Sequence, residues 1–109
     1  MKINLVKWTN ILERIKLDKE MEKAFLKFYY KLKEVEWKTP NDILNSFNSA
    51  DILKCATGNR IVFNVGGNKY RLVCGYFFGK SNIQLFVKFI GTHKEYDSID
   101  PCKVNMYKR

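Results

Sequence analysis

The residues best suited to chemistry lie in one short stretch, GTHKEYDSID, at Gly91–Asp100. It contains the only histidine of the chain, His93, and the next four residues are a lysine, two carboxylates and a tyrosine. A histidine titrates near neutral pH and can give or take a proton in catalysis. The stretch also follows an apolar run, IQLFVKFI. It can therefore also be interpreted as a charged loop that ends a strand, in which Glu95 and Asp97 cap the next turn.

Two hairpins are predicted to position this stretch. Gly66-Gly67 joins two strand-like runs, and residues 79–82 join the second run to a third. The two turns predict these opposed pairs: Val65 and Asn68, Phe63 and Tyr70, Ile61 and Leu72, Phe78 and Ile83, Tyr76 and Leu85, Cys74 and Val87, and Leu72 and Phe89. Opposed residues share a face of the sheet, so most of these side chains form one apolar core face.

The opposite face is expected to be open, with cationic and polar groups at one end and aromatic rings at the other. It collects Val62, Asn64, Lys69, Arg71, Val73, Phe77, Phe86 and Lys88. In the predicted register Arg71 and Lys88 are diagonal neighbours on the second and third strands. Asn64 opposes Lys69 nearby, and the third strand leads into His93 beside these cations.

Two cations and an imidazole on a sheet face suit cleavage of RNA by its own 2′-hydroxyl. That reaction needs a base for the 2′-OH, an acid for the leaving 5′-oxygen and positive charge for the phosphorane. Arg71 and Lys88 are candidates to hold the phosphate, and His93 is a candidate acid or base. Tyr96 is a candidate to stack on a base or donate a proton. Phe77 and Phe86 are candidate stacking platforms, with packing as the structural alternative.

The N-terminal half predicts helices that cover the core face. Residues 3–16 predict either one helix or a short strand followed by a helix, and residues 18–35 predict an amphipathic helix with Asp18 as its N-cap. Thr39-Pro40 has the chemistry of an N-cap and first helical position. Residues 48–59 predict a loop that ends in a turn at Gly58-Asn59. The pattern of helices followed by strands indicates an α+β domain.

Size and charge bound the class of protein. The chain has 109 residues, which predicts one domain over 1–109. Its formal net charge is +9, from 20 Lys and Arg against 11 Asp and Glu. Such a surplus favours a polyanionic partner, with nucleic acid as the first candidate, although a lysine-rich solvated surface would show the same excess. No apolar run approaches the roughly 18 residues of a membrane span, and the N-terminus lacks the apolar core of a signal peptide.

The three cysteines predict reduced thiols in a cytosolic protein. Cys55, Cys74 and Cys102 are an odd number without CxxC spacing, and Cys74 lies inside an apolar run. A zinc site would need more ligands at tighter spacing than these cysteines and one histidine supply.

The segment RIVFNVGGNKYRLV followed by FIGTHKEYDSID closely resembles the HigB-type toxins of bacterial type II toxin–antitoxin systems. The upstream EWKTPNDILNSFNSADIL fits the same family, so the likeness covers about residues 36–100. It implies a RelE-like microbial ribonuclease fold, with N-terminal helices packed on a twisted antiparallel sheet of at least three strands. It also implies an mRNA interferase without a metal cofactor, acting on the message at the ribosome in the cytoplasm. The implied partners are a helix-turn-helix antitoxin and, through that complex, operator DNA.

The resemblance also implies a set of site residues. The motif residues are Asn64, Asn68, Arg71, Thr92, His93, Tyr96 and Asp97, and among them Asn64, Asn68, Thr92 and Asp97 are expected to contact RNA. Many relatives carry arginine at the position of Lys88, so the charge is retained there and the bidentate fork is lost. In the resulting hypothesis Arg71 and Lys88 stabilise the phosphorane, while Arg60 and Lys69 follow the RNA backbone. The competing hypotheses are a non-catalytic RNA- or ribosome-binding module and an inactive toxin that serves only in operon control.

Overall fold

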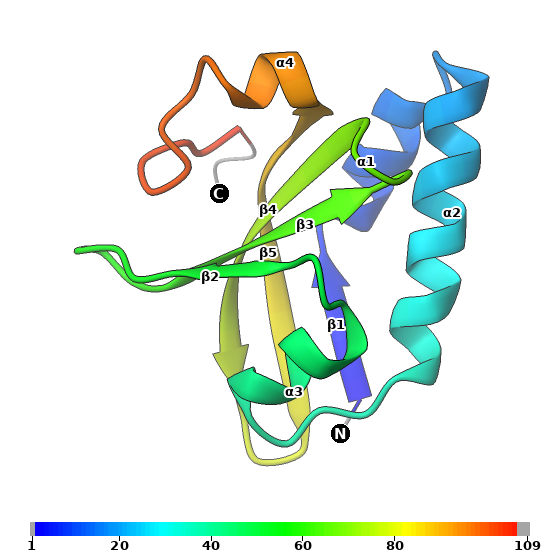
Figure 1. Ribbon diagram of the computed structural model, residues 1–109. Helices are drawn as coiled ribbons and strands as arrows, with labels where there is room; N and C mark the ends of the chain where they lie inside the picture. Colours follow the sequence, from blue (N-terminus) through cyan, green and yellow to red (C-terminus); the bar gives the residue numbers. More distant parts are fainter. Residues whose placement is uncertain (1, 107–109) are drawn as a thin grey trace.

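Five strands form one mixed sheet with the first three helices against one of its faces (Figure 1). The computed structural model describes residues 2–106. The elements are β1 (Lys2–Val6), α1 (Trp8–Ile15), α2 (Lys19–Glu34), α3 (Pro40–Ser46), β2 (Asp51–Leu53), β3 (Arg60–Val65), β4 (Tyr70–Phe78), β5 (Asn82–Thr92) and α4 (His93–Tyr96). The strand order is β1-β5-β4-β3-β2. β2 to β5 are antiparallel neighbours, and β1 adds to the β5 edge in parallel. The predicted α+β class is confirmed.

The start of the chain is a short strand followed by a helix, the second of the two predicted alternatives. Lys7 takes a left-handed conformation (φ 75°) between β1 and α1, which turns the chain off the sheet edge. α1 then buries Ile11 and Ile15 in the core. None of the helices in residues 2–106 has the length and apolar character needed to cross a membrane.

α2 is the main cover of the sheet and confirms the predicted amphipathic helix. The Asp18 side chain accepts hydrogen bonds from the backbone N–H groups of Glu20 (3.0 Å) and Met21 (3.2 Å), so it satisfies two of the donors that a helix start leaves free. The buried side chains recur at steps of three and four residues: Met21, Phe25, Phe28 and Leu32. They pack on Phe63, Tyr70 and the other apolar side chains of the same sheet face.

The segment between α2 and β3 agrees with the prediction for its helix and differs for its loop. Thr39 and Asp42 form a capping box at the start of α3, with Pro40 in the first turn. Hydrogen bonds from the backbone N–H groups of Lys38 and Thr39 lower the pKa of Asp42. Within the predicted loop 48–59, residues Asp51–Leu53 instead form the edge strand β2.

The first hairpin register is two residues away from the predicted one. Its loop contains four residues, 66–69, so Val65 pairs with Tyr70 and Phe63 with Leu72. Gly66 and Gly67 both have positive φ, 65° and 70°, which explains the glycine pair. Because side chains alternate with a period of two, the two-residue error leaves every side chain on its predicted face.

A β-bulge changes the second hairpin half-way along. The predicted pairs of Phe78 with Ile83, Tyr76 with Leu85 and Cys74 with Val87 are confirmed. Val73 then pairs with Phe89, so Lys88 is an extra residue on β5, and the predicted pairing of Leu72 with Phe89 is wrong. Beyond the bulge Ile90 occupies the core face, while Phe89 lies on the opposite face.

The face opposite the helices is partly covered, which corrects the expectation of a fully open face. Val62, Val73 and Phe89 are buried there in a second small cluster. Their cover comes from Tyr96, Ile99 and Val104, and Figure 1 shows this C-terminal segment on the far side of the sheet from α2. Phe77 at the other end of β4 is 60% exposed.

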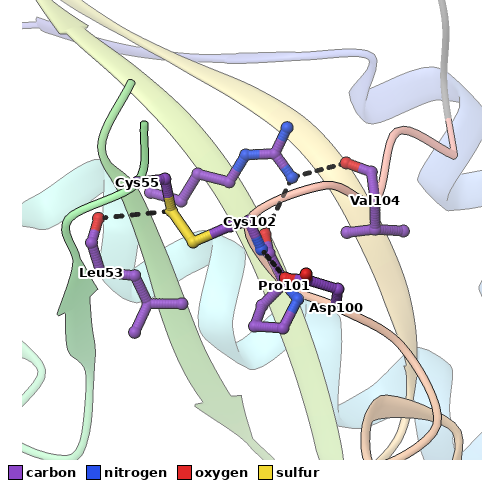
Figure 2. Close-up of a disulfide and its surroundings, with 7 residues drawn as sticks. Leu53, Cys55, Asp100, Pro101, Cys102 and Val104 are labelled. Atoms are coloured by element: carbon purple, nitrogen blue, oxygen red, sulfur yellow. Dashed lines mark hydrogen bonds between the residues drawn. A yellow bond between two sulfur atoms is a disulfide. The ribbon is translucent and has the colours of Figure 1, made fainter. Parts of the chain in front are cut away.

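A disulfide fastens the covering segment to the sheet. Cys55, just after β2, is bonded to Cys102, with their Cα atoms 5.5 Å apart (Figure 2). Arg60 lies beside it and donates through Nη1 to the carbonyl oxygens of Pro101 (2.8 Å) and Val104 (2.5 Å). The prediction of reduced thiols is therefore wrong for Cys55 and Cys102. It is confirmed for Cys74, a free and buried thiol.

Candidate active site

Arg71 is the centre of a polar cluster where β4 meets the end of β5. Only 6% of the residue is exposed. Its Nη1 donates to the backbone oxygens of Asn68 (3.2 Å) and Tyr70 (3.1 Å), and its Nη2 donates to Asn68 Oδ1 (2.7 Å) and to His93 Nδ1. Asn68, in the turn before β4, therefore supplies two of the four acceptors that orient the guanidinium. We call Asn68, Arg71, His93, Tyr96 and Asp97 the arginine–histidine cluster.

The imidazole of His93 lies between a cation and a carboxylate. A guanidinium has donors only, so His93 Nδ1 must accept the hydrogen bond from Arg71. The ring proton is then on Nε2, which lies 3.5 Å from Oδ2 of Asp97, the residue that ends α4. The His93 side chain is 45% exposed. The cluster thus presents an oriented histidine at the surface, backed by a buried positive charge.

Tyr96 forms the floor of the cluster. Its ring packs on Phe89 with the ring centroids 6.3 Å apart, and the guanidinium carbon of Arg71 lies 5.9 Å from its centroid. Burial raises the pKa of Tyr96, nearby Asp51 and Asp97 add to the rise, and the positive charge of Arg71 opposes it. The phenol therefore keeps its proton at neutral pH and is suited to donate a hydrogen bond.

The short helix α4 places His93, Tyr96 and Asp97 because its start is firmly capped. Thr92 Oγ1 accepts from the Glu95 backbone N–H (3.1 Å), and Glu95 Oε1 accepts from the Thr92 N–H (2.9 Å). The backbone N–H of His93 also donates to the carbonyl oxygen of Lys69 (2.9 Å), which joins α4 to the first hairpin. The stretch therefore ends a strand with a cap, as one interpretation predicted, although Thr92 joins Glu95 in the cap and Asp97 faces His93 instead. The same stretch contributes three residues to the polar cluster, and their part in chemistry stays a prediction.

Comparison with known proteins agrees with this geometry. The family model HigB_toxin, described as the RelE-like toxic component of a toxin-antitoxin system, matches residues 21–99. The chain belongs to the HigB toxin family. This HigB-family toxin is also 32% identical, over 76 residues, to a protein of Escherichia coli O6:H1 named mRNA interferase HigB, and the alignment covers 70% of this chain and 71% of that protein. The resemblance first recognised in the hairpin and the THKEYD motif is confirmed, and as the toxic component of such a system the chain has an antitoxin partner.

Lys88 and Arg60 lie outside the cluster of the HigB-family toxin. Lys88 sits in the bulge, with its Cε 3.5 Å from the place that a Cβ on Gly75 would take. Gly75 is four residues from Arg71 along β4, a distance of about 13 Å at strand spacing. Because the Lys88 side chain lies over Gly75, Lys88 is not the diagonal neighbour of Arg71 that was predicted. Arg60 is 9% exposed and holds the C-terminal segment, and burial lowers its pKa. Its geometry is that of a structural tether.

Asn64 and Lys69 also have partners within the protein. Asn64 pairs with Arg71 across the strands, whereas the prediction opposed it to Lys69, and its Nδ2 donates to the carbonyl oxygen of Ser49 (3.1 Å). Lys69 forms an exposed ion pair with Glu20 of α2, and this carboxylate raises the lysine pKa. Both residues lie near the cluster, and Lys69 touches it through its backbone oxygen, which accepts the hydrogen bond from the His93 N–H.

Gly91 is a site residue that the sequence reasoning missed. It pairs with Arg71 and is buried beside the cluster. A Cβ there would lie 2.7 Å from Phe89 Cζ and 3.0 Å from Glu95 Oε1, the carboxylate that caps α4. The glycine directly before the THKEYD motif was the available signal, because glycine in a strand often marks a close approach of other atoms.

Changing Gly91 to alanine is expected to destabilise the protein by about 1–3 kcal/mol, the usual range for overpacking a filled site. The added methyl group would displace the Phe89 ring under Tyr96 and the cap of α4. Urea denaturation measures the change. Gly75→Ala is the matched control, since a Cβ there meets only Lys88 Cε at 3.5 Å. Equal stability of the two variants would contradict the packing argument.

Proposed function

We propose that this HigB-family toxin is an mRNA endoribonuclease that acts in the cytoplasm on messages held by the translating ribosome. The observation that carries the proposal is the arginine–histidine cluster, in which the only histidine of the chain is held at the surface between Arg71 and Asp97. The family assignment and the name of the Escherichia coli relative, mRNA interferase HigB, support the same activity.

The proposed reaction is attack of a ribose 2′-OH on the adjacent 3′-phosphate. The 2′-oxygen loses its proton and bonds to phosphorus, the bond from phosphorus to the 5′-oxygen breaks, and that oxygen takes up a proton. The products are a 2′,3′-cyclic phosphate and a 5′-hydroxyl. The protein must therefore transfer protons at two oxygens and stabilise negative charge on the phosphorane.

The geometry supports separate parts for three residues. His93 transfers a proton, because it is exposed and its tautomer is set by Arg71 and Asp97. Arg71 supplies positive charge from beneath the site, since the hydrogens on its two terminal nitrogens already have protein acceptors. A bidentate grip on phosphate would require replacing at least one of those bonds. Tyr96 donates a hydrogen bond to the substrate, and Lys88 has no part in this reaction.

The partners proposed beyond the antitoxin itself follow the family's pattern. The antitoxin is a helix-turn-helix protein of the HigA type, and operator DNA is bound only through the toxin–antitoxin complex. The net charge of +9 supports association with ribosomal and messenger RNA. Thr92 and Asp97, predicted as RNA contacts, serve here to cap α4 and to orient His93.

Mapping the 5′ ends of messages after a short induction tests the proposal. New ends within reading frames, carrying 5′-hydroxyl groups, are expected within minutes. Two alternatives predict other outcomes: a non-catalytic binder would stall ribosomes on intact messages, and an inactive toxin would leave both growth and messages unchanged.

Tyr96→Phe is expected to lower cleavage about 10- to 100-fold, as for the loss of one hydrogen bond to a charged group, while the protein remains folded. The substitution removes the hydrogen-bond donor and keeps the ring that packs on Phe89 and lies beneath Arg71. Single-turnover cleavage of ribosome-bound message gives the rate. Tyr30→Phe is the control, because Tyr30 is 60% exposed on α2. A Tyr96→Phe rate equal to this control would remove the phenol from the mechanism.

A further inference from the structure

A row of lysines follows one flank of α2. Lys19, Lys23, Lys27 and Lys31 are spaced four residues apart, and all are exposed. A four-residue step turns about 40° beyond one full turn of the helix, so the row moves gradually around the helix surface along α2. This gradual shift brings Lys23, Lys27 and Lys31 to the side of α2 that faces the hairpin of β3 and β4.

Two contiguous hollows lie between this flank and the hairpin. One, of about 310 Å³, is lined by Lys27 and Lys31 on α2 and by Asn64 and the turn glycines on the hairpin side. The other, of about 240 Å³, is lined by Lys23, Lys27 and Lys69. Ala24, Lys27 and Gly66 line both, so the two hollows form one groove, which we call the lysine groove.

The charge of the lysine groove is strongly unbalanced. Four lysines line it, Lys23, Lys27, Lys31 and Lys69, against one carboxylate, Glu20, which leaves +3. Glu20 is already paired with Lys69. Lys31 Nζ lies 4.5 Å from the centroid of the Phe47 ring, so this ammonium is held at the groove by a cation–π contact. Within residues 2–106, no carboxylate lies within ion-pair distance of Lys23, Lys27 or Lys31.

We infer that the lysine groove binds the phosphodiester backbone of the substrate RNA where the strand leaves the active site. This inference rests on the proposed function. Lysines act as point charges for phosphates, and Lys23 to Lys31 span about 12 Å, the length of three to four nucleotides at a stacked spacing of about 3.4 Å.

The shared hairpin is the reason to assign the groove to the same RNA strand as the site. Asn64 lines the groove, and its partner across the strands is Arg71. Gly66 and Gly67 line the groove, and Asn68 in the same turn holds Arg71 from the other side. A strand leaving His93 therefore has to pass only the tip of this hairpin to reach the lysines.

Binding of uncleavable RNA tests the inference. The probes are 2′-O-methyl RNAs of 4 and 12 nucleotides, which lack the attacking hydroxyl. The triple variant Lys23→Gln, Lys27→Gln, Lys31→Gln is expected to bind the 12-mer about 10-fold more weakly at 0.1 M salt, with a salt slope lower by about 2. Its affinity for the 4-mer should not change. The control Lys16→Gln, Lys54→Gln, Lys80→Gln removes the same charge from exposed positions outside the groove and should keep 12-mer affinity within about 2-fold.

Several outcomes would overturn the inference. Equal losses in the two triples would mean that only net charge matters, and no loss in either would mean that the groove does not bind the probe. If 12-mer binding is kept but ribosome pelleting or the complex with the antitoxin is lost, the groove belongs to ribosomal RNA or to the protein partner. Lys27→Gln alone, which affects both hollows, gives a smaller loss of the same kind and serves if the triple variant does not fold.

The proposed function can fail independently of this inference. If the wild-type toxin makes no cuts but the groove variant loses 12-mer binding, the groove stands and the nuclease assignment is wrong. If the toxin cuts messages and the groove variant binds the 12-mer like the control, the nuclease assignment is correct and the lysine groove does not bind the substrate.

Discussion

Replacing His93 with alanine is expected to lower cleavage of ribosome-bound message about 100- to 10,000-fold, the usual contribution of one proton-transfer group. It should therefore abolish growth arrest on induction. The imidazole is the group that the fold orients, with Nδ1 accepting from Arg71 and Nε2 facing Asp97. Because 45% of the side chain is exposed, its removal should leave the folded structure largely intact. Single-turnover rates and melting temperatures measure the two effects separately.

The matched control is Lys94→Ala in the same turn of α4. Lys94 is exposed and adjacent in sequence, so it tests whether any truncation of this helix matters. We expect it to retain growth arrest. Asp97→Asn should be intermediate, because it weakens the orientation of the ring and leaves the ring in place. Growth arrest by His93→Ala equal to wild type would remove the histidine from the mechanism and favour a binding module.

Loss of the Cys55–Cys102 disulfide is expected to destabilise the protein by about 4 kcal/mol. The bond closes a loop with a sequence separation of 47 residues. Removing such a cross-link raises the entropy of the unfolded chain, which lowers the free energy of unfolding by roughly 4 kcal/mol. Cys55→Ser and Cys102→Ser should each show this loss in urea denaturation. The free energy of unfolding of the double variant should be no lower than that of the less stable single variant, because all three variants lack the same bond.

Thiol counting checks the premise of that experiment. Without reductant the folded protein should show no reactive thiol, because burial raises the pKa of Cys74 and shields it. Unfolding should expose one thiol, and reduction followed by unfolding should expose three. Three thiols in the unreduced, unfolded protein, or a denaturation midpoint unaffected by reductant, would contradict the assigned bond.

The sequence was informative where local rules decide the structure. The three-four spacing of Met21, Phe25, Phe28 and Leu32 and the cap at Asp18 predicted α2 correctly. The period of two in the strands assigned nearly every side chain to its face, even with the first turn misjudged. The GTHKEYDSID stretch was placed beside Arg71 for the right reason, since β5 pairs with β4 up to Thr92.

The errors came from contacts between residues far apart in the chain. The bulge at Lys88 has no clear local signal, and it is explained by the apolar partners that Phe89 gains on the far face from Ile99 and Val104. The structural role of Arg60 was missed for the same reason, because its acceptors lie in the C-terminal segment, 41 and 44 residues away in sequence. The disulfide likewise joins two loops that only the finished sheet brings together.

The parallel pairing of β1 with β5 has a consequence for the time at which the toxin becomes active. Each residue of β1 pairs with a residue 80 positions later, so the first strand to be synthesised is the last to find its place. Contacts of such long separation slow folding, and here they delay closure of the sheet until β5 has been made. The arginine–histidine cluster spans residues 68 to 97, so it cannot assemble before residue 97 has been made. The candidate site therefore forms in the same late stage of folding as the closure of the sheet, and shorter nascent chains lack it.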